Sequence, residues 1–202
     1  MAEMKRGANV ALTREIPGLR GVVLGLHVTA GAERLVLDNL VLATLLCDGD
    51  SKALSDEHFV FFNQLSSPDL SVTQLERALG TDHEQVEVDL TAVPAEVERI
   101  VVVAYLNDGT TGRRTLGQLR ECSIRVLNLD GNAELVRSEN LAPGLSTETA
   151  VVLGEVYTNG KDWKFKVIGE GYAQGITGIA RDYGVALRGR APVRRVGERA
   201  LP

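Results

Sequence analysis

The feature of this chain that most constrains its fold is a series of short β-rich runs, each bounded by a turn sequence and spaced about ten residues apart. Residues 85–90 give the clearest example, because polar and apolar residues alternate there. The alternation directs Val86, Val88 and Leu90 to a buried face and the acidic residues between them to water. This pattern predicts an all-β fold rather than a βαβ fold. We therefore expect a mostly β, two-sheet β-sandwich with a few short helices, including one near the C-terminus.

The remaining elements are expected from the same kind of pattern. Residues 35–46 fit either a strand pair or one bent strand, and residues 71–79 could carry one helical turn. The Asn-Gly turn at 159–160 predicts a hairpin, and residues 175–183 predict a short closing helix. Further strands are expected at residues 9–13, 21–28, 58–62, 100–106, 123–128, 134–137, 149–157 and 163–168.

The composition is that of a folded domain with a slightly acidic surface. Hydrophobic residues make up 44% of the chain, charged residues 24%, and the net charge is -5. A negative net charge removes the general attraction to phosphate backbones that nucleic-acid binding needs, so we expect no nucleic-acid partner. The same negative charge is less unfavourable for binding a cation or a basic protein partner.

The chain is expected to form one domain over residues 1–187, followed by a flexible basic tail over residues 188–202. This tail is either solvated or able to contact anionic lipid or nucleic acid. It carries Arg188, Arg190, Arg194, Arg195 and Arg199.

The N-terminal residues lack the apolar segment of a secretory signal. No apolar run approaches the roughly 18 residues of a membrane span. We therefore expect a cytoplasmic protein.

Several runs in fixed order resemble the tellurium-resistance TerD family of bacterial stress proteins. The run Gly-Ala-Asn-Val-Ala-Leu-Thr at 7–13 precedes Pro-Gly-Leu at 17–19, and Phe-Val-Phe-Phe-Asn at 59–63 precedes Leu-Ser-Ser at 65–67. The resemblance continues through the segments at 82–90, 93–94, 146–149, 154–157, 163–165 and 169–184. It covers nearly the whole chain and leaves out only the basic tail.

The resemblance implies a two-sheet β-sandwich that binds Ca²⁺ through acidic loops, with a role in stress and tellurite resistance. This chain departs from the acidic pattern of the family, because Val36 and Leu40 replace acids that flank Asp38, and the loop at 75–84 is shorter. Calcium takes six to eight oxygen ligands, so lost carboxylates weaken a site. The candidate metal ligands that remain are Asp38, Asn63, Asp82, Glu84, Asn107 and Asp108.

Each candidate ligand also has a structural interpretation. Asp108 precedes a glycine and fits a turn, Asp38 could hydrogen-bond a bulge, and Asp82 and Glu84 could be solvated charges. Two binding hypotheses therefore stay open, a calcium-responsive module and a metal-free interaction module that has lost the sites. Protein partners are expected in both but are not identified by the sequence.

We expect no enzymatic activity, because the chain offers few nucleophile and base pairs. The two cysteines, Cys47 and Cys122, lie in or beside apolar runs without a redox motif and are interpreted as buried thiols. His27 and His58 belong to strand patterns that favour structural roles. An oxyanion hydrolase or redox enzyme is the competing hypothesis.

Overall fold

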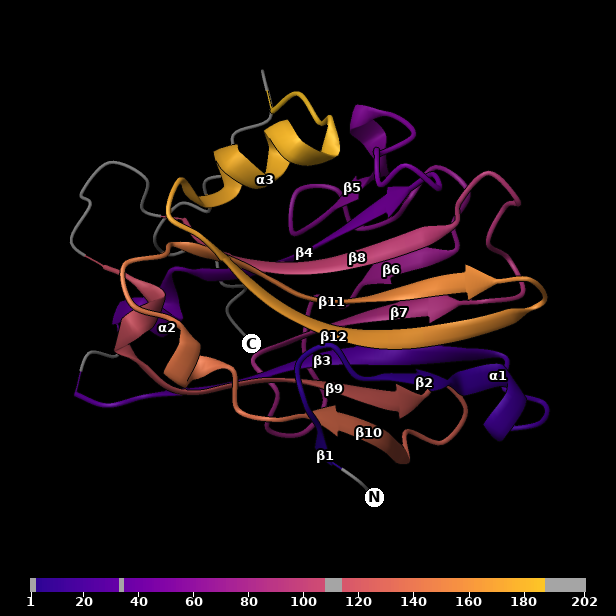
Figure 1. Cartoon of the computed structure of the whole chain (residues 1–202), viewed down its shortest axis with the longest axis horizontal. Coiled ribbons are helices and arrows are strands. Elements are labelled where there is room, and N and C mark those ends of the chain that lie inside the picture. The colour runs from indigo at the N-terminus through magenta and orange to yellow at the C-terminus, as the bar shows by residue number, and fades with distance from the viewer. Residues whose placement is uncertain (1–2, 33–34, 108–113, 188–202) are drawn as a thin grey trace.

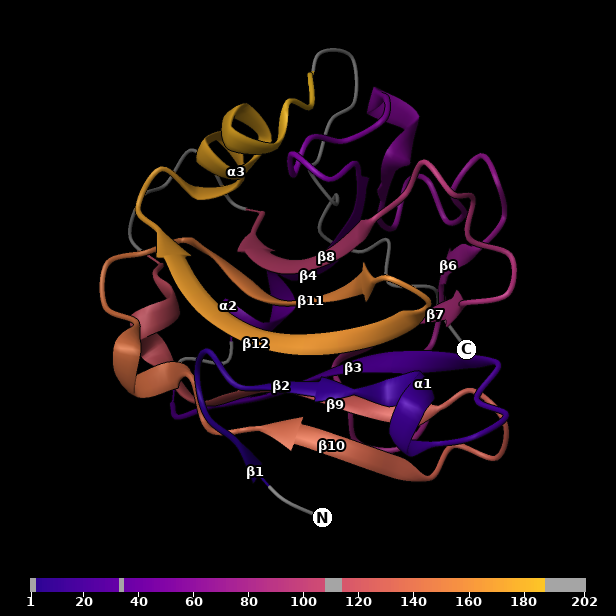
Figure 2. The same ribbon diagram turned by 45° about the vertical axis from the view of Figure 1, so that its right-hand side comes forward.

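The computed structural model describes residues 3–32, 35–107 and 114–187, and its strands form two six-stranded sheets that pack face to face (Figure 1). Figure 2 shows the two sheets as separate layers. Neighbouring strands are antiparallel except β1 and β10, which are parallel. The predicted two-sheet β-sandwich is confirmed. In spatial order, sheet A contains β1 (Glu3–Met4), β10 (Glu134–Ser138), β9 (Leu119–Asn128), β3 (Gly21–Ala30), β7 (Glu84–Asp89) and β6 (Val72–Gln74), and sheet B contains β2 (Asn9–Ala11), β12 (Asp162–Tyr172), β11 (Ala150–Asn159), β8 (Arg99–Leu106), β4 (Leu40–Cys47) and β5 (Phe59–Val60).

The main hydrophobic core lies between the sheets and is built from alternate residues of each strand. In β7, Val86 and Val88 are fully buried, and Leu90, just after the strand, is almost so, as the alternation predicts. Strand β3 contributes Val22, Leu24 and Leu26 to the same core, and β8 contributes Ile100, Val102 and Ala104 from the opposite sheet. Branched and aliphatic side chains thus fill the interior of a chain that has only 4% aromatic residues.

A second hydrophobic cluster lies on the outer face of sheet B, where helix α3 (Gly175–Tyr183) covers the strands (Figure 1). Ile179 and Ala180 of the helix pack with Val103 and Tyr105 of β8. The helix ends at Gly184, which has a φ of 72°. Glycine adopts this left-handed conformation without a steric penalty, which makes it a common residue just after a helix. The predicted closing helix is therefore confirmed.

Some local predictions differ from the structure. Residues 12–15 form helix α1 (Leu12–Glu15), where the sequence predicted that a strand continues to residue 13. Residues 35–46 are neither two strands nor one bent strand, because helix α2 (Leu35–Asp38) precedes β4. The side-chain amide of Asn39 donates to the carbonyl of Leu35 at 2.8 Å and so closes this helical turn. Local hydrogen bonding thus ends the strand pattern at Asn39.

Residues 71–79 carry strand β6 where a helical turn was predicted. Val72 pairs with Val88 and Gln74 pairs with Val86, so strand pairing with β7 outweighs the local sequence preference. The β11–β12 hairpin forms as predicted, with Asn159 opposite Asp162. Among the described residues, no helix is both long and apolar enough to cross a membrane. The predicted basic tail at 188–202 lies outside the described residues, and the domain boundary at 187 stays a prediction.

Candidate functional site

Three of the predicted metal ligands lie at one end of the sandwich, where β4 and β7 begin and β8 ends. Asp38 is exposed at the last residue of α2, directly before β4. Asn107 follows β8, and its backbone N–H donates to the carbonyl of Asn39 at 2.8 Å. Glu84 begins β7 and contacts β4. We call this region, formed by Asp38, Glu84 and Asn107, the loop end. Asp108 lies outside the described residues.

Glu84 is a buried carboxylate that bridges the two sheets. Its Oε2 atom accepts hydrogen bonds from the backbone N–H of Leu42 at 2.9 Å and from Nε2 of Gln74 at 3.1 Å. On the edge of β4 opposite β8, strand β5 pairs only with Thr44 and Leu45 and does not reach Leu42. Glu84 therefore satisfies a backbone donor that has no strand neighbour.

His83, next to Glu84, caps the same edge of β4. Its Nε2 atom lies 2.8 Å from the carbonyl oxygen of Leu40, and a carbonyl only accepts, so the ring donates from Nε2. The backbone N–H of His83 donates to the carbonyl of Leu26 in β3. His83 and Glu84 together hold the edge of β4 against sheet A. Their hydrogen bonds explain both residues structurally.

One atom beside Glu84 remains without a hydrogen bond. Oε1 of Gln74 is buried and has no partner among the described residues. A buried acceptor without a donor is costly, so such an atom often marks a position for water or a cation. This observation beside Glu84 favours a bound ion.

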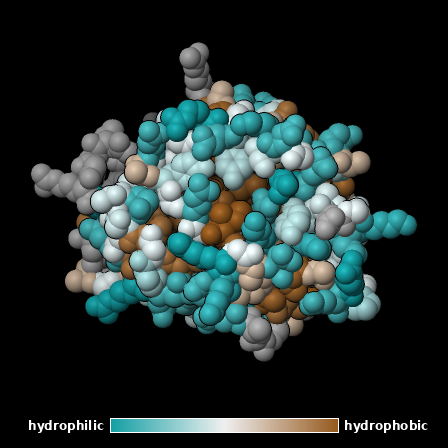
Figure 3. Space-filling model, viewed as in Figure 1, coloured by the Kyte–Doolittle hydropathy of each residue, from teal (hydrophilic) through white to brown (hydrophobic). Residues whose placement is uncertain are grey.

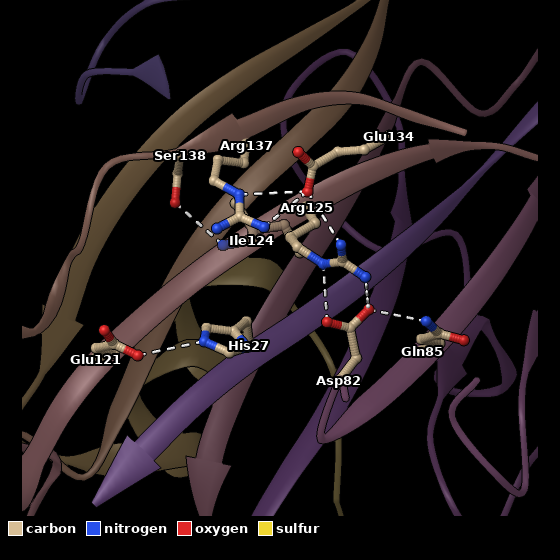
Figure 4. A network of polar contacts seen from close by, with 9 residues as sticks. All are labelled: His27, Asp82, Gln85, Glu121, Ile124, Arg125, Glu134, Arg137 and Ser138. Carbon is tan, nitrogen blue, oxygen red and sulfur yellow. Dashed lines mark hydrogen bonds and ion pairs between the residues drawn. The ribbon is translucent and has the colours of Figure 1, made fainter. Parts of the chain in front are cut away.

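Asp82 points toward Arg125 and Gln85 on sheet A (Figure 4). Its two carboxylate oxygens accept from Nε and Nη2 of Arg125 in β9, both at 2.8 Å, and Oδ2 also accepts from Gln85 at 2.8 Å. The Asp82 side chain is 0% exposed and that of Arg125 is 19% exposed. This is a bidentate ion pair, the strong geometry for an arginine with a carboxylate. An arginine and a calcium ion would compete for the same two oxygens.

Gly25 in β3 provides the space that Asp82 occupies. A Cβ atom at position 25 would lie 2.1 Å from Oδ2 of Asp82, so any larger residue would displace the carboxylate. Gln85 holds the same loop, since its side-chain amide exchanges two hydrogen bonds with the backbone of Leu79. The segment before β7 is thus anchored on sheet A by Asp82 and Gln85.

The ion pair of Asp82 continues into a chain of alternating charges that we call the sheet A network, formed by Asp82, Arg125, Glu134 and Arg137 (Figure 4). Glu134 accepts from Nη1 of Arg125 at 3.0 Å and from Nη2 of Arg137 at 2.9 Å. Hydrogen bonding to Asp82 raises the pKa of Arg125 further above its ordinary value. Burial raises the pKa of Glu134, but hydrogen bonds from Arg137 and Arg125 outweigh it and hold that pKa below its ordinary value.

Within the described residues, the predicted ligands are divided among different contacts. Asn63 is exposed in the segment after β5, Asp82 is paired with Arg125, and Glu84 holds the edge of β4. In residues 3–32, 35–107 and 114–187, no group of three or more His, Cys, Asp and Glu side chains is placed to hold a metal ion. Calcium takes six to eight oxygens, so a calcium site here would need further oxygen ligands besides these side chains.

The two cysteines considered for catalysis are both buried among apolar side chains. Cys122 is buried in the main core, and burial raises the pKa of its thiol to about 12. Burial, followed by the charge of Asp48, raises the pKa of Cys47 to about 12 as well. Both thiols are therefore protonated at neutral pH and unreactive.

The histidines form local or exposed contacts. Nδ1 of His58 lies 2.6 Å from Oγ of Ser55, three residues earlier in the same helical turn. His27 faces the outer side of sheet A, where Nε2 lies 3.3 Å from Glu121 (Figure 4). A catalytic nucleophile works with a base that a third group orients toward it. In the described residues, no third group is seen to orient His58 beside Ser55 or His27 beside Glu121.

The sequence did not identify Arg125 or Gln74 as partners of the candidate carboxylates. Arg125 lies 43 positions from Asp82, and Gln74 lies within residues 71–79, for which one helical turn was expected. One sequence signal could have indicated the pair. Arg125 occupies an outward position of a predicted strand, and a partly buried arginine usually has an acidic partner.

This fold and its loop end define a class, the two-sheet β-sandwich proteins with acidic residues at strand ends. The TerD domain family model matches residues 1–183. The chain is 33% identical over 186 residues to tellurium resistance protein TerD of Serratia marcescens, covering 90% of this chain and 96% of that protein. It is 37% identical over 192 residues to general stress protein 16U of Bacillus subtilis, covering 91% and 97%. The chain therefore belongs to the TerD family.

A solved structure supports the fold. The crystal structure of a homologue of telluride resistance protein TerD from Streptomyces coelicolor superimposes with a TM-score of 0.61 at 17% sequence identity. The superposition covers 81% of this chain and 96% of the other. At this identity the likeness concerns the fold alone.

Proposed function

We propose that this chain is a stress-associated binding protein that acts through protein contacts, without catalysis and without a bound calcium ion. Membership of the TerD family supports the stress-associated role, because its relatives include proteins named for tellurium resistance and general stress. The observation that carries the metal-independent part is the ion pair between Asp82 and Arg125, which uses both carboxylate oxygens. The cytoplasmic location expected from the sequence stays a prediction.

In this chain the Arg125 guanidinium takes the place that a metal ion would have beside Asp82. A metal ion at an acidic loop neutralises carboxylates and fixes the loop, and the Arg125 guanidinium does both for Asp82. Glu84 is fixed in turn by Leu42 and Gln74. The segment before β7 is therefore held by side chains of this chain, so its surface is available to a partner whatever the calcium concentration.

A calcium-responsive protein is the second candidate. The buried Oε1 atom of Gln74 beside Glu84 favours it, together with the exposed carboxylate of Asp38 at the same end. In this form Glu84, Gln74 and Asp38 would supply oxygens, and the ion would stiffen the loop end.

Calcium titration of the calcium-depleted full-length chain separates the two candidates. We expect no heat in calorimetry and no rise in Tm at millimolar calcium. A ligand at 100 times its Kd stabilises the folded state by about 2.7 kcal/mol, so real binding would be visible. A rise in Tm that Glu84→Gln abolishes and the exposed-site control Glu170→Gln preserves would overturn the metal-independent proposal in favour of the second candidate.

The absence of catalysis is tested separately. Purified protein should not convert tellurite in the presence of a thiol reductant, because both cysteines are buried and protonated. Turnover that is lost in Cys47→Ala or Cys122→Ala would contradict the proposal and support a redox enzyme.

A further inference from the structure

A groove of about 430 Å³ lies at the opposite end of the sandwich from the loop end. At this end, which we call the hairpin end, Cys47 of β4 pairs with Arg99 of β8, whereas Leu40 pairs with Leu106 at the loop end. The groove runs between the β7–β8 connection and the β11–β12 turn, which lie side by side in Figures 1 and 2. Its lining residues are Val93, Pro94, Ala95, Val97, Glu98, Thr158, Gly160 and Trp163.

Trp163, the single tryptophan of the chain, forms an aromatic wall of this groove. It is half-buried and packs against the main core, and its backbone N–H donates to Oγ1 of Thr13 at 2.9 Å. Val97 is 1% exposed, so it joins the groove to the core, while Val93 and Pro94 lie nearer the surface. The groove therefore has a mixed polar and apolar lining, in which Trp163 supplies one large ring. Partly exposed tryptophans of this kind often dominate the energy of protein interfaces.

The only charged residue among those that line the groove is Glu98. Its side chain is exposed and has no ion-pair partner in the part of the chain that the structure describes. A Cβ atom at Gly49 would lie 2.5 Å from its Oε2, so the carboxylate lies against the turn between Asp48 and Asp50. The groove thus has an acidic rim.

The nearby basic residues do not neutralise this rim. Arg14 is paired with Asp162 at 3.0 Å, and Nζ of Lys52 donates to the carbonyl of Asp182 in the last turn of α3. Lys161 is exposed in the β11–β12 turn and is the one base of that turn. The acids Asp48, Asp50, Glu96 and Glu98 outnumber it, and the whole chain carries a net charge of -5.

We propose that this groove binds a lysine or arginine side chain of an extended segment of a protein partner. The apolar stem of the side chain would lie on Val93 and Pro94, and its charged head would reach Glu98. The face of Trp163 adds a favourable interaction with a cation. The acidic rim attracts basic segments at longer range and repels acidic ones.

The face of the molecule seen in Figure 3 suits a small docking site better than a large interface. On the face seen in Figure 3, hydrophobic residues form several separate patches, each bordered by hydrophilic ones. A single anchor side chain with flanking contacts suits such a surface. This inference rests on the proposed function, because it gives that binding protein a specific surface and a partner chemistry.

Fluorescence of Trp163 reports directly on the groove. The probes are capped pentapeptides with the sequence Gly-Pro-Xaa-Pro-Gly, in which Xaa is Lys, Arg, norleucine or Glu. We expect a saturable change in emission with Lys and Arg, at least tenfold weaker binding of the norleucine peptide, and no change with the Glu peptide. Binding of the Lys peptide should weaken as salt is added, because exposed charges are screened.

Glu98→Gln and Glu170→Gln form a matched pair of variants, since both replace an exposed glutamate. We expect Glu98→Gln to weaken binding of the Lys peptide at least fivefold and Glu170→Gln to leave it unchanged. No fluorescence change with any peptide, equal binding of the Glu peptide, or equal loss in both variants would overturn the inference. Calcium plays no part in this experiment, so its failure leaves the metal-independent proposal standing, and a calcium response would leave the groove standing.

Discussion

The outer faces of the two sheets are covered in different ways. On sheet A, the charges of Asp82, Arg125, Glu134 and Arg137 form a network that holds the segment before β7 (Figure 4). On sheet B, helix α3 buries apolar side chains such as Ile179 against β8 and neighbouring strands. The same kind of surface, the outer side of a twisted sheet, is thus closed by ion pairs on one side of the molecule and by hydrophobic packing on the other.

The ion pairs on sheet A and the apolar packing on sheet B depend on different conditions. Ion pairs depend on protonation and on salt, and partly exposed pairs contribute little net free energy. Apolar packing depends on side-chain volume and is insensitive to pH. We therefore expect the loop on sheet A to be sensitive to solution conditions and helix α3 to be sensitive to mutation.

The largest effect is expected from Ile179→Ala in α3. Ile179 is 0% exposed in the outer cluster of sheet B, and truncation leaves a cavity beneath the helix. We expect the free energy of unfolding to fall by about 3 kcal/mol, measured by urea denaturation. Ile176→Ala, at a partly buried position of the same helix, should cost clearly less. Equal costs for both variants would show that α3 is not anchored by its buried face.

A smaller loss is expected from Asp82→Asn on sheet A. The substitution removes the charge that pairs with Arg125, and breaking a buried pair costs about 3–5 kcal/mol when both partners are buried. Arg125 is 19% exposed, so we expect a loss of about 2 kcal/mol. The double variant Asp82→Leu with Arg125→Met should recover much of this loss, since it leaves no unpaired charge. A double variant as unstable as Asp82→Asn would argue against the ion pair as the anchor.

Part of the pH dependence of stability should come from Glu134, because its arginine partners stay charged while it titrates. Burial raises the pKa of Glu134, but its hydrogen bonds with Arg137 and Arg125 hold that pKa below its ordinary value. Its contribution is therefore present above that value and is lost as the pH falls through the lower pKa of the folded state. In Glu134→Gln, the fall in unfolding free energy between pH 7 and pH 3 should be smaller by less than about 1 kcal/mol. An unchanged pH profile would remove Glu134 from the network.

The smallest effect concerns the accessibility of the two thiols under native conditions. Cys47 lies in the cluster beneath α3, and Cys122 lies in the core between the sheets. A thiol reagent should label Cys47 whenever α3 detaches, but Cys122 only when the whole domain unfolds. Ile179→Ala should therefore speed labelling of Cys47 more than that of Cys122. Equal rates for both cysteines would mean that the helix and the sandwich open together.

Much of the fold could be predicted from sequence because strand periodicity and turn residues are local properties. The alternation at Val86 and Val88, the hairpin at 159–160 and the helix before Gly184 all carry their own sequence pattern. The errors fell where a distant partner decides the conformation. Residues 72–74 become a strand only because β7 lies beside them.

The candidate site was harder to predict for the same reason. The sequence correctly marked acidic residues at strand ends, but it could not show that Asp82 and Glu84 lie on opposite sides of sheet A. Residues two positions apart share a face inside a strand, yet Asp82 precedes the strand and its carboxylate follows the space left by Gly25. The pairing with Arg125 joins segments that are far apart in sequence.

The capping of β4 by His83 and Glu84 has a consequence for self-association. An uncovered strand edge presents free N–H and C=O groups and is a template for aggregation with a second chain. At Leu40 and Leu42, these groups are occupied by the two side chains from sheet A. The stretch from Leu40 to Cys47 is almost wholly apolar, so it is the part of the chain with most to lose from an open edge. His83 and Glu84 thus leave this stretch of β4 without an open edge for a second chain to pair with.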